Sequence, residues 1–164
     1  MVRTVAIAVA VAAASLPGRR APADEAGPPP APFVGSDACG ACHPDEFAQW
    51  RATAHARADR SLGARAGDRR CQGCHTTGTA PAGRPAFAGV GCEACHGAGG
   101  GYAADDIMRD RPLARALGLR DLSTPQARAA VCAACHRDGL RIARFDPDAA
   151  WQRIAHGAST EARR

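Results

Sequence analysis

Apolar residues are unevenly distributed along this chain, and its one long apolar stretch lies near the beginning. The stretch runs from Val5 to Leu16, follows a short positive segment with Arg3, and is too short to span a bilayer. The following Ala21-Pro22-Ala23 fits a small-residue cleavage site. We therefore predict that residues 1–23 are a signal peptide and that the mature protein is periplasmic, without stable membrane insertion. An uncleaved anchor helix is the alternative.

Beyond this leader, the polar and apolar positions predict short helices joined by irregular segments. Residues 24–34 are a Pro-rich linker, which should be extended and mobile. The run from about Pro44 to about Ala58 contains no helix breaker and predicts one continuous helix. Two more helix starts are marked by a capping residue before proline, at Thr124-Pro125 and Asp146-Pro147. The last of these helices should hold His156 in its final turn, with Gly157 as the stop.

The segments between these helices are rich in glycine and proline. Thr76–Gly91 is expected to be a loop or a short hairpin, and Ser36 or Asp37 should cap the first helical turn. Residues 98–122 include a helix-like segment that ends near Leu117-Gly118. We therefore expect a mainly α protein with much irregular loop, in which residues 35–157 form a single compact domain. Residues 158–164 are a charged tail.

A C-x-x-C-H motif occurs four times in the chain and uses all eight cysteines. This spacing is the signature of covalent haem attachment, because two thiols on one helical turn reach one porphyrin and the next histidine reaches its iron. Zinc ribbons, disulfides and a thioredoxin-like C-x-x-C are the alternatives. We predict four covalently attached haem c groups, each with its iron. The attachment residues are Cys39, Cys42, Cys71, Cys74, Cys92, Cys95, Cys132 and Cys135, and the proximal ligands are His43, His75, His96 and His136.

Composition and charge agree with a cofactor-filled core. Four Phe, two Trp and one Tyr cannot build an ordinary core, so the porphyrins should supply most of the buried apolar surface. All basic residues are arginines, and after signal removal 18 of them face 16 acidic residues. Since haem propionates add negative charge, the sequence pI of about 9.0 is a poor argument for nucleic-acid binding, and we expect none.

The axial ligands can be counted from the sequence. Beyond the motif histidines, the mature chain offers His55, His156 and Met108 as strong donors, and it contains no lysine. At least one of the four irons therefore lacks an ordinary internal sixth ligand, unless Tyr102, the new N-terminal amine or a partner subunit supplies one. A continuous helix would carry His55 about 18 Å from His43, so His55 should serve a different haem.

Some of these residues have ordinary structural alternatives. Met108 can pack against a porphyrin instead of binding iron. Trp50 and Trp151 are expected to pack on haem faces, and Tyr102 to bind a propionate. The arginines are expected to be mostly solvated, with some pairing to propionates.

The motifs and their surroundings resemble the tetrahaem cytochrome c-554 family over roughly residues 35–157. The matching features are the run from Cys39 through Trp50 to Thr53-Ala-His55-Ala, the second motif Cys71-Gln-Gly-Cys-His75, the phrase Gly89-Val-Gly-Cys-Glu-Ala-Cys-His-Gly97, the fourth motif Cys132-Ala-Ala-Cys-His136 and the final helix with His156.

This resemblance implies specific axial ligands. His55 would be the distal ligand of the haem on the third motif, and His156 that of the haem on the fourth. The haem on His75 would be five-coordinate. The chain departs from the family in one respect, because residues 97–135 contain no histidine to complete the first haem. Met108 is the substitute of comparable donor strength.

The function expected from these features is single-electron transfer between redox partner proteins, outside the cytoplasm and without catalysis. Two alternatives remain open. The five-coordinate haem could act on small nitrogen oxides as an oxidoreductase, or the chain could be a haem subunit of a larger respiratory complex. The sequence identifies neither donor nor acceptor, and it shows no catalytic residues beside His75.

Overall fold

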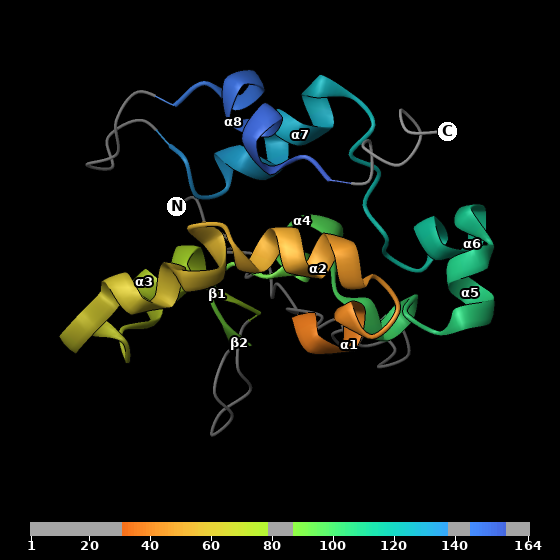
Figure 1. Ribbon diagram of the computed structural model, residues 1–164, viewed down its shortest axis with the longest axis horizontal. Coiled ribbons are helices and arrows are strands. Elements are labelled where there is room, and N and C mark those ends of the chain that lie inside the picture. The colour runs from red at the N-terminus through yellow and green to blue at the C-terminus, as the bar shows by residue number, and fades with distance from the viewer. Residues whose placement is uncertain (1–30, 79–86, 138–144, 157–164) are drawn as a thin grey trace, which may run out of the picture.

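The computed structural model describes residues 31–78, 87–137 and 145–156. The predicted signal peptide and the charged tail lie outside these ranges. Within them the chain is mainly helical with much irregular structure, which confirms the predicted fold class (Figure 1). The elements are, in order, α1 (Ser36–Gly40), α2 (Pro44–Arg51), the 3-10 helix η2 (His55–Arg65), α3 (Arg69–His75), β1 (Thr76–Thr77), β2 (Phe87–Ala88), α4 (Cys92–His96), the 3-10 turn η3 (Gly99–Gly101), α5 (Asp105–Arg109), α6 (Arg111–Ala116), α7 (Pro125–Ala133) and α8 (Pro147–Ile154).

The elements lie in two tiers in Figure 1. Helices α7 and α8 pack against each other in the upper tier. A row containing α3 and α2 lies below them, with α5 and α6 at one end and the β1–β2 hairpin on the far side of the row. No helix within the described ranges is long and apolar enough to cross a membrane.

The predicted continuous helix from Pro44 to Ala58 is wrong, because the chain breaks between α2 and η2. Helix α2 ends at Arg51, and η2 begins at His55. The Thr53 hydroxyl donates to the carbonyl of Trp50 over 2.7 Å, and the Arg57 guanidinium donates to the carbonyl of Arg51 over 3.2 Å. These side chains replace the backbone donors that would continue an α-helix. The break changes the direction in which His55 is presented.

The two predicted starts at Thr124 and Asp146 are confirmed. The Thr124 side chain accepts a hydrogen bond from a backbone N–H of α7, and the Asp146 carboxylate accepts two from α8. The predicted end of α8 is wrong. The helix stops at Ile154, and Ala155 is extended with φ −59° and ψ 133°. His156 therefore lies beyond the helix, and the predicted stop at 157 falls outside the described residues.

The expected cap on the first helical turn is also wrong. The N-cap of α1 is Gly35, and no side chain accepts a hydrogen bond there. Ser36 is instead the first residue of α1, and its hydroxyl accepts the backbone N–H of Cys92 over 3.2 Å. The serine thus ties α1 to α4, the helix that carries the third motif.

The expected hairpin is present as an antiparallel pair. Thr76 faces Ala88 and Thr77 faces Phe87. The buried Thr77 hydroxyl donates to the carbonyl of Gly89 over 2.9 Å and accepts the N–H of Gly91 over 2.6 Å, which fixes the chain just before the third motif. The helix-like segment predicted within 98–122 forms two helices, α5 and α6, and ends at Ala116, with Leu117 as the C-cap.

The protein core of the described residues is small. Its buried apolar side chains are Leu62, Tyr102, Ala114 and Ala150. The end of the predicted mobile linker also contributes, since the carbonyl of Pro32 accepts the N–H of Gly100 over 2.9 Å. So small a core agrees with the expectation that a cofactor supplies most of the buried apolar surface.

Candidate haem-binding site

Each C-x-x-C-H motif lies on a short helical turn. The second and third motifs are contained in α3 and α4, respectively. The first begins in α1 and the fourth in α7, and each ends in the turn that follows. In both of these turns the histidine N–H donates to the carbonyl of the motif's first cysteine over 2.9 Å. This helical geometry places both thiols of a motif on one side, as attachment to one porphyrin requires.

The eight cysteines are free in the structure. None forms a disulfide. Within the described ranges, no group of three or more His, Cys, Asp or Glu side chains converges as a metal-binding cluster. The thiols are therefore available in four pairs for thioether bonds.

Contacts between cysteine side chains show which of the four motifs lie next to one another. The Cys39 thiol lies within hydrogen-bonding reach of Cys92, and this contact lowers the pKa of Cys92 to about 6. The Cys135 thiol likewise contacts Cys74 and lies 3.9 Å from the carbonyl of Gly73. These contacts join the first motif to the third and the fourth motif to the second.

Cys95 and Cys132 lie near enough for the Cys132 thiol to affect the pKa of Cys95, which places the third motif near the fourth. Burial is the main reason why the pKa of Cys95 is raised, and the Cys132 thiol adds to the shift. The spatial order of the motifs is therefore first, third, fourth, second.

Two histidine pairs stand out in the fold. The rings of His55 and His136 have centroids 6.1 Å apart, and those of His96 and His156 are 6.0 Å apart. Metal–imidazole bonds of about 2 Å hold two ring centroids roughly 6 Å apart across one metal ion. The separations therefore suit one iron between each pair.

These pairs differ from the assignment that the family resemblance implied. His55 faces the fourth motif and His156 faces the third, which is the reverse of the expectation. Burial lowers the pKa of His55, and the charge of His136 lowers it further. Burial, followed by the charge of His156, lowers the pKa of His96 in the same way. Both shifts favour the neutral imidazole, which is the form that binds a metal.

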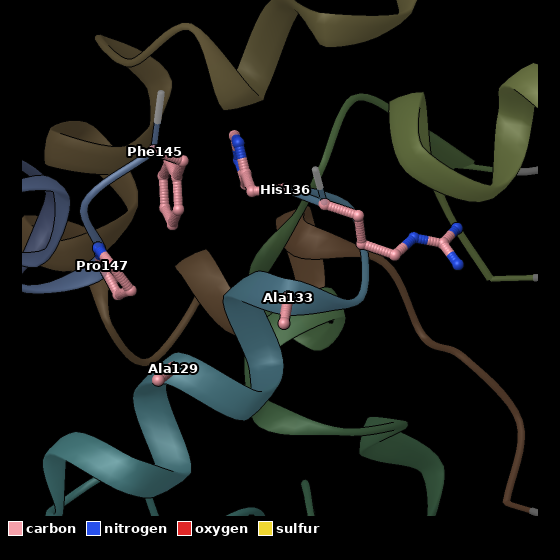
Figure 2. Close-up of a pocket in the computed structure, with 6 residues that line it drawn as sticks. Ala129, Ala133, His136, Phe145 and Pro147 are labelled. Atoms are coloured by element: carbon pink, nitrogen blue, oxygen red, sulfur yellow. The ribbon is translucent and has the colours of Figure 1, made fainter. Parts of the chain in front are cut away.

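The environment of His136 leaves room for a large group. Figure 2 shows its ring stacked on Phe145, with centroids 4.1 Å apart and planes inclined by 13°. Its buried Nδ1 has no hydrogen-bond partner. A pocket of about 300 Å³ opens here, and it is lined by Ala129, Ala133, His136, Arg137, Phe145 and Pro147. A hollow of this kind beside a motif histidine would suit the edge of a haem group.

Sequence reasoning missed Phe145 because nothing in its neighbourhood resembles a motif. The position of Phe145 just before the Asp146 cap could have indicated it, because an apolar residue there commonly packs on the structure beside the helix start.

His75 is held differently from the other motif histidines. Its Nδ1 lies 2.8 Å from the carbonyl of Ala58 and 3.0 Å from the hydroxyl of Ser61. The Ser61 hydroxyl itself donates to the Ala58 carbonyl over 2.7 Å. The proton of His75 therefore belongs on Nδ1, which leaves Nε2 free for a metal. No sequence signal points to Ser61, since only the folding of η2 onto α3 brings it here.

His43 and Met108 belong to the first motif and to α5, respectively. His43 is exposed, and it lies close enough to His96 to contribute to the lowering of that residue's pKa. Met108 is half-buried on α5, next to Arg109. Asp105 is the main cause of the raised pKa of Arg109, and Cys42 contributes to it. Helix α5 thus lies near the first motif, but contact between Met108 and that motif stays a prediction.

Glu93, inside the third motif, joins three parts of the fold. Its side chain is almost fully buried, with 2% exposed. The carboxylate accepts backbone N–H groups from Val34 over 2.9 Å, Gly35 over 2.7 Å and Gly99 over 2.6 Å. It therefore fixes the chain entering α1 and the turn η3 on α4. Sequence reasoning quoted this glutamate only as part of the family phrase.

The aromatic side chains make contacts within the protein that the sequence did not predict. The Trp50 indole donates to the carbonyl of Val90 over 2.8 Å, and the Tyr102 hydroxyl donates to that of Gly97 over 2.8 Å. Both therefore hold the backbone beside the third motif. Trp151 packs under the guanidinium of Arg128, 4.7 Å from its ring centroid. The Trp50 indole N–H, the Tyr102 hydroxyl and the Trp151 ring thus all contact other parts of the protein.

A mainly helical chain with four C-x-x-C-H turns and two facing histidine pairs has the features of a c-type cytochrome. Residues 38–97, which contain the first three motifs, match the model of the family described as "Cytochrome c554 and c-prime". Cytochrome c-554 of Nitrosomonas europaea is 33% identical over 99 residues, covering 46% of this chain and 42% of that protein. The match thus spans less than half of the relative. No solved structure matches the chain.

These matches confirm the resemblance predicted from the motifs. Over residues 38–97 the chain is similar to the cytochrome c-554 family.

Proposed function

We propose that this chain is an exported tetrahaem c-type cytochrome that passes single electrons between redox partner proteins. The observation that carries the proposal is the presence of two pairs of facing imidazoles, with centroids 6.1 and 6.0 Å apart, each formed by one motif histidine and one distant histidine. The family of residues 38–97 gives further support. When bound, haem supplies reversible one-electron chemistry, while the ligands and their surroundings set its potential.

The residues of this chain would share the work of holding the four groups. Each cysteine pair forms the thioether links, and the histidine that follows supplies the proximal ligand. His55 completes the site of the fourth motif and His156 that of the third. His75 has no facing imidazole among the described residues, so its site is the one proposed to keep an open distal side. The carbonyl of Ala58 and the hydroxyl of Ser61 orient its ring.

The haem count is tested by mass. Co-expression with a c-type maturation system should give a protein heavier than its mature polypeptide by four haems, with the N-terminus near Asp24. Alanine at both cysteines of one motif should lower the count to three, because each motif binds one group independently. A wild-type protein with any other count, or a double variant that keeps four, contradicts the proposal.

Met108 is proposed as the sixth ligand of the first haem, which has no second imidazole. A thioether favours ferrous iron more than imidazole does, so His/Met ligation raises the reduction potential. Met108→Ala should add a second high-spin haem and remove the highest low-spin potential. Met108→His should restore the low-spin state at a lower potential. Redox titration with spin-state spectroscopy distinguishes this from simple packing, in which wild type already has two high-spin haems.

The alternative function is an oxidoreductase of small nitrogen compounds at the open haem of His75. The observation that favours it is the lack of a facing imidazole within the described residues, since an open position is what a substrate needs. Steady turnover of nitric oxide, nitrite or hydroxylamine by the holoprotein would support this reading. Rapid electron exchange without turnover supports the carrier.

A further inference from the structure

A strongly basic surface surrounds the second motif. Residues 51–70 contain six arginines and two aspartates, so this segment has a net charge of +4. The arginines extend over α2, η2 and α3, and all six are exposed. We call this set the arginine surface; it consists of Arg51, Arg57, Arg60, Arg65, Arg69 and Arg70.

The arginine surface borders the site of His75 directly. Ser61, which contacts the His75 ring over 3.0 Å, follows Arg60 in η2. Arg69 and Arg70 form the first turn of the helix that carries the whole second motif. Of these six arginines, only Arg70 forms an ion pair in the described structure, with Asp68 at 2.8 Å, while Arg57 donates to backbone carbonyls. Most of the positive charge is therefore available to a partner.

The segment that contains the first motif has a net negative charge. Residues 31–50 contain no arginine and three acidic residues, Asp37, Asp45 and Glu46, which give a net charge of −3. Figure 1 places α3 at one end of the lower tier and α1 towards the other. Charges of opposite sign at the two ends orient an approaching charged protein before contact, which favours one docking site over the other.

We propose that the arginine surface is the docking site for a redox protein whose own cofactor lies beneath an acidic face. This inference rests on the proposed electron-transfer function and specifies which motif faces the partner. The second motif is the natural contact, because it ends the first–third–fourth–second order and lies inside the basic region. Electrons would enter or leave the protein through this end.

Other occupants fit the surface less well. Membrane binding by a basic segment also needs exposed apolar side chains for insertion. The one leucine of η2, Leu62, is buried with 6% exposed, and the exposed large apolar residues, such as Leu113 and Phe87, lie on other elements. A specific site for a small anion needs converging donors, whereas these arginines are spread over three exposed elements. Two propionates of one haem would neutralise only part of the +4 charge.

The test compares two double variants of the holoprotein with the same change in net charge. Arg60→Glu with Arg65→Glu reverses the centre of the arginine surface, while Arg111→Glu with Arg153→Glu reverses two exposed arginines on α6 and α8. The probe is reduced flavodoxin, chosen for its acidic surface, and stopped-flow absorbance gives the second-order rate of haem reduction. Dithionite reduces each protein separately, which checks that the haems are present and redox-active.

We expect the first variant to react at least about tenfold more slowly than wild type at low salt, and the difference to shrink at high salt. The second variant should stay within about twofold of wild type. Equal slowing of both variants would mean a general charge effect and would overturn the proposal, as would no slowing of either.

Three other outcomes also overturn it. Slowing that accompanies shifted haem potentials would assign the arginines to propionates. Sedimentation of wild type, but not of the first variant, with anionic phospholipid vesicles, at an unchanged flavodoxin rate, would assign them to a membrane. Loss of nitrite binding at an unchanged flavodoxin rate would assign them to a small anion. A protein that dithionite cannot reduce would instead reject the proposed function itself.

Discussion

Replacing Glu93 by alanine is expected to lower the free energy of unfolding by about 3–9 kcal/mol. The buried carboxylate accepts three backbone N–H groups, from Val34, Gly35 and Gly99. Alanine leaves all three donors without a partner, and each unsatisfied buried group costs about 1–3 kcal/mol. Since small domains are stable by about 5–15 kcal/mol, this is a large share of the total. Denaturant unfolding of the holoprotein, followed by circular dichroism, measures it.

Two further variants make the Glu93 result specific. Glu46→Ala removes a half-buried glutamate of α2 and should cost less than about 1 kcal/mol, because surface changes away from buried networks have small effects. Glu93→Gln keeps the shape and one acceptor oxygen, so its cost should lie between those of the two alanine variants. If Glu93→Ala and Glu46→Ala shift the unfolding midpoint equally, the three hydrogen bonds do not have the role assigned here.

The second large effect concerns the pairing of histidines. His55→Ala should convert one of the four proposed haems from low-spin to high-spin, because it removes the imidazole that faces His136. His156→Ala should do the same for the haem on His96. The haem count should stay at four in both variants, since all cysteines are kept. Magnetic circular dichroism or electron paramagnetic resonance counts the high-spin irons.

Adding a substitution of Phe145 to each histidine variant shows which haem has lost its sixth ligand. The Phe145 ring stacks on His136 with centroids 4.1 Å apart, so Phe145→Leu changes the surroundings of the proximal ligand proposed for the fourth motif. The iron–histidine stretching band of the newly five-coordinate haem should shift when Phe145→Leu is added to His55→Ala. It should not shift when the same change is added to His156→Ala. The reverse result would restore the pairing implied by the family resemblance.

Much of this protein could be predicted from its sequence because the determining interactions are local. A C-x-x-C-H turn needs only five consecutive residues, so the motifs could be recognised without knowing the fold. The caps at Thr124 and Asp146 act within one turn of their own helices and were predicted correctly. The hairpin expected within Thr76–Gly91 also depends on neighbouring glycine and proline residues, and its strands pair as Thr76 with Ala88.

The tertiary structure alone decided how these parts meet, because the relevant contacts join residues far apart in the chain. The hydrogen bonds of Thr53 and Arg57 that accompany the helix break are local, but His55 faces His136, 81 positions later, only because distant elements pack together. Glu93 likewise acts on Gly35, 58 positions earlier. Periodicity and spacing report which residues can form a helix or hold a haem. Neither periodicity nor spacing gives the distances between such elements. Those distances determine which histidine would complete which site.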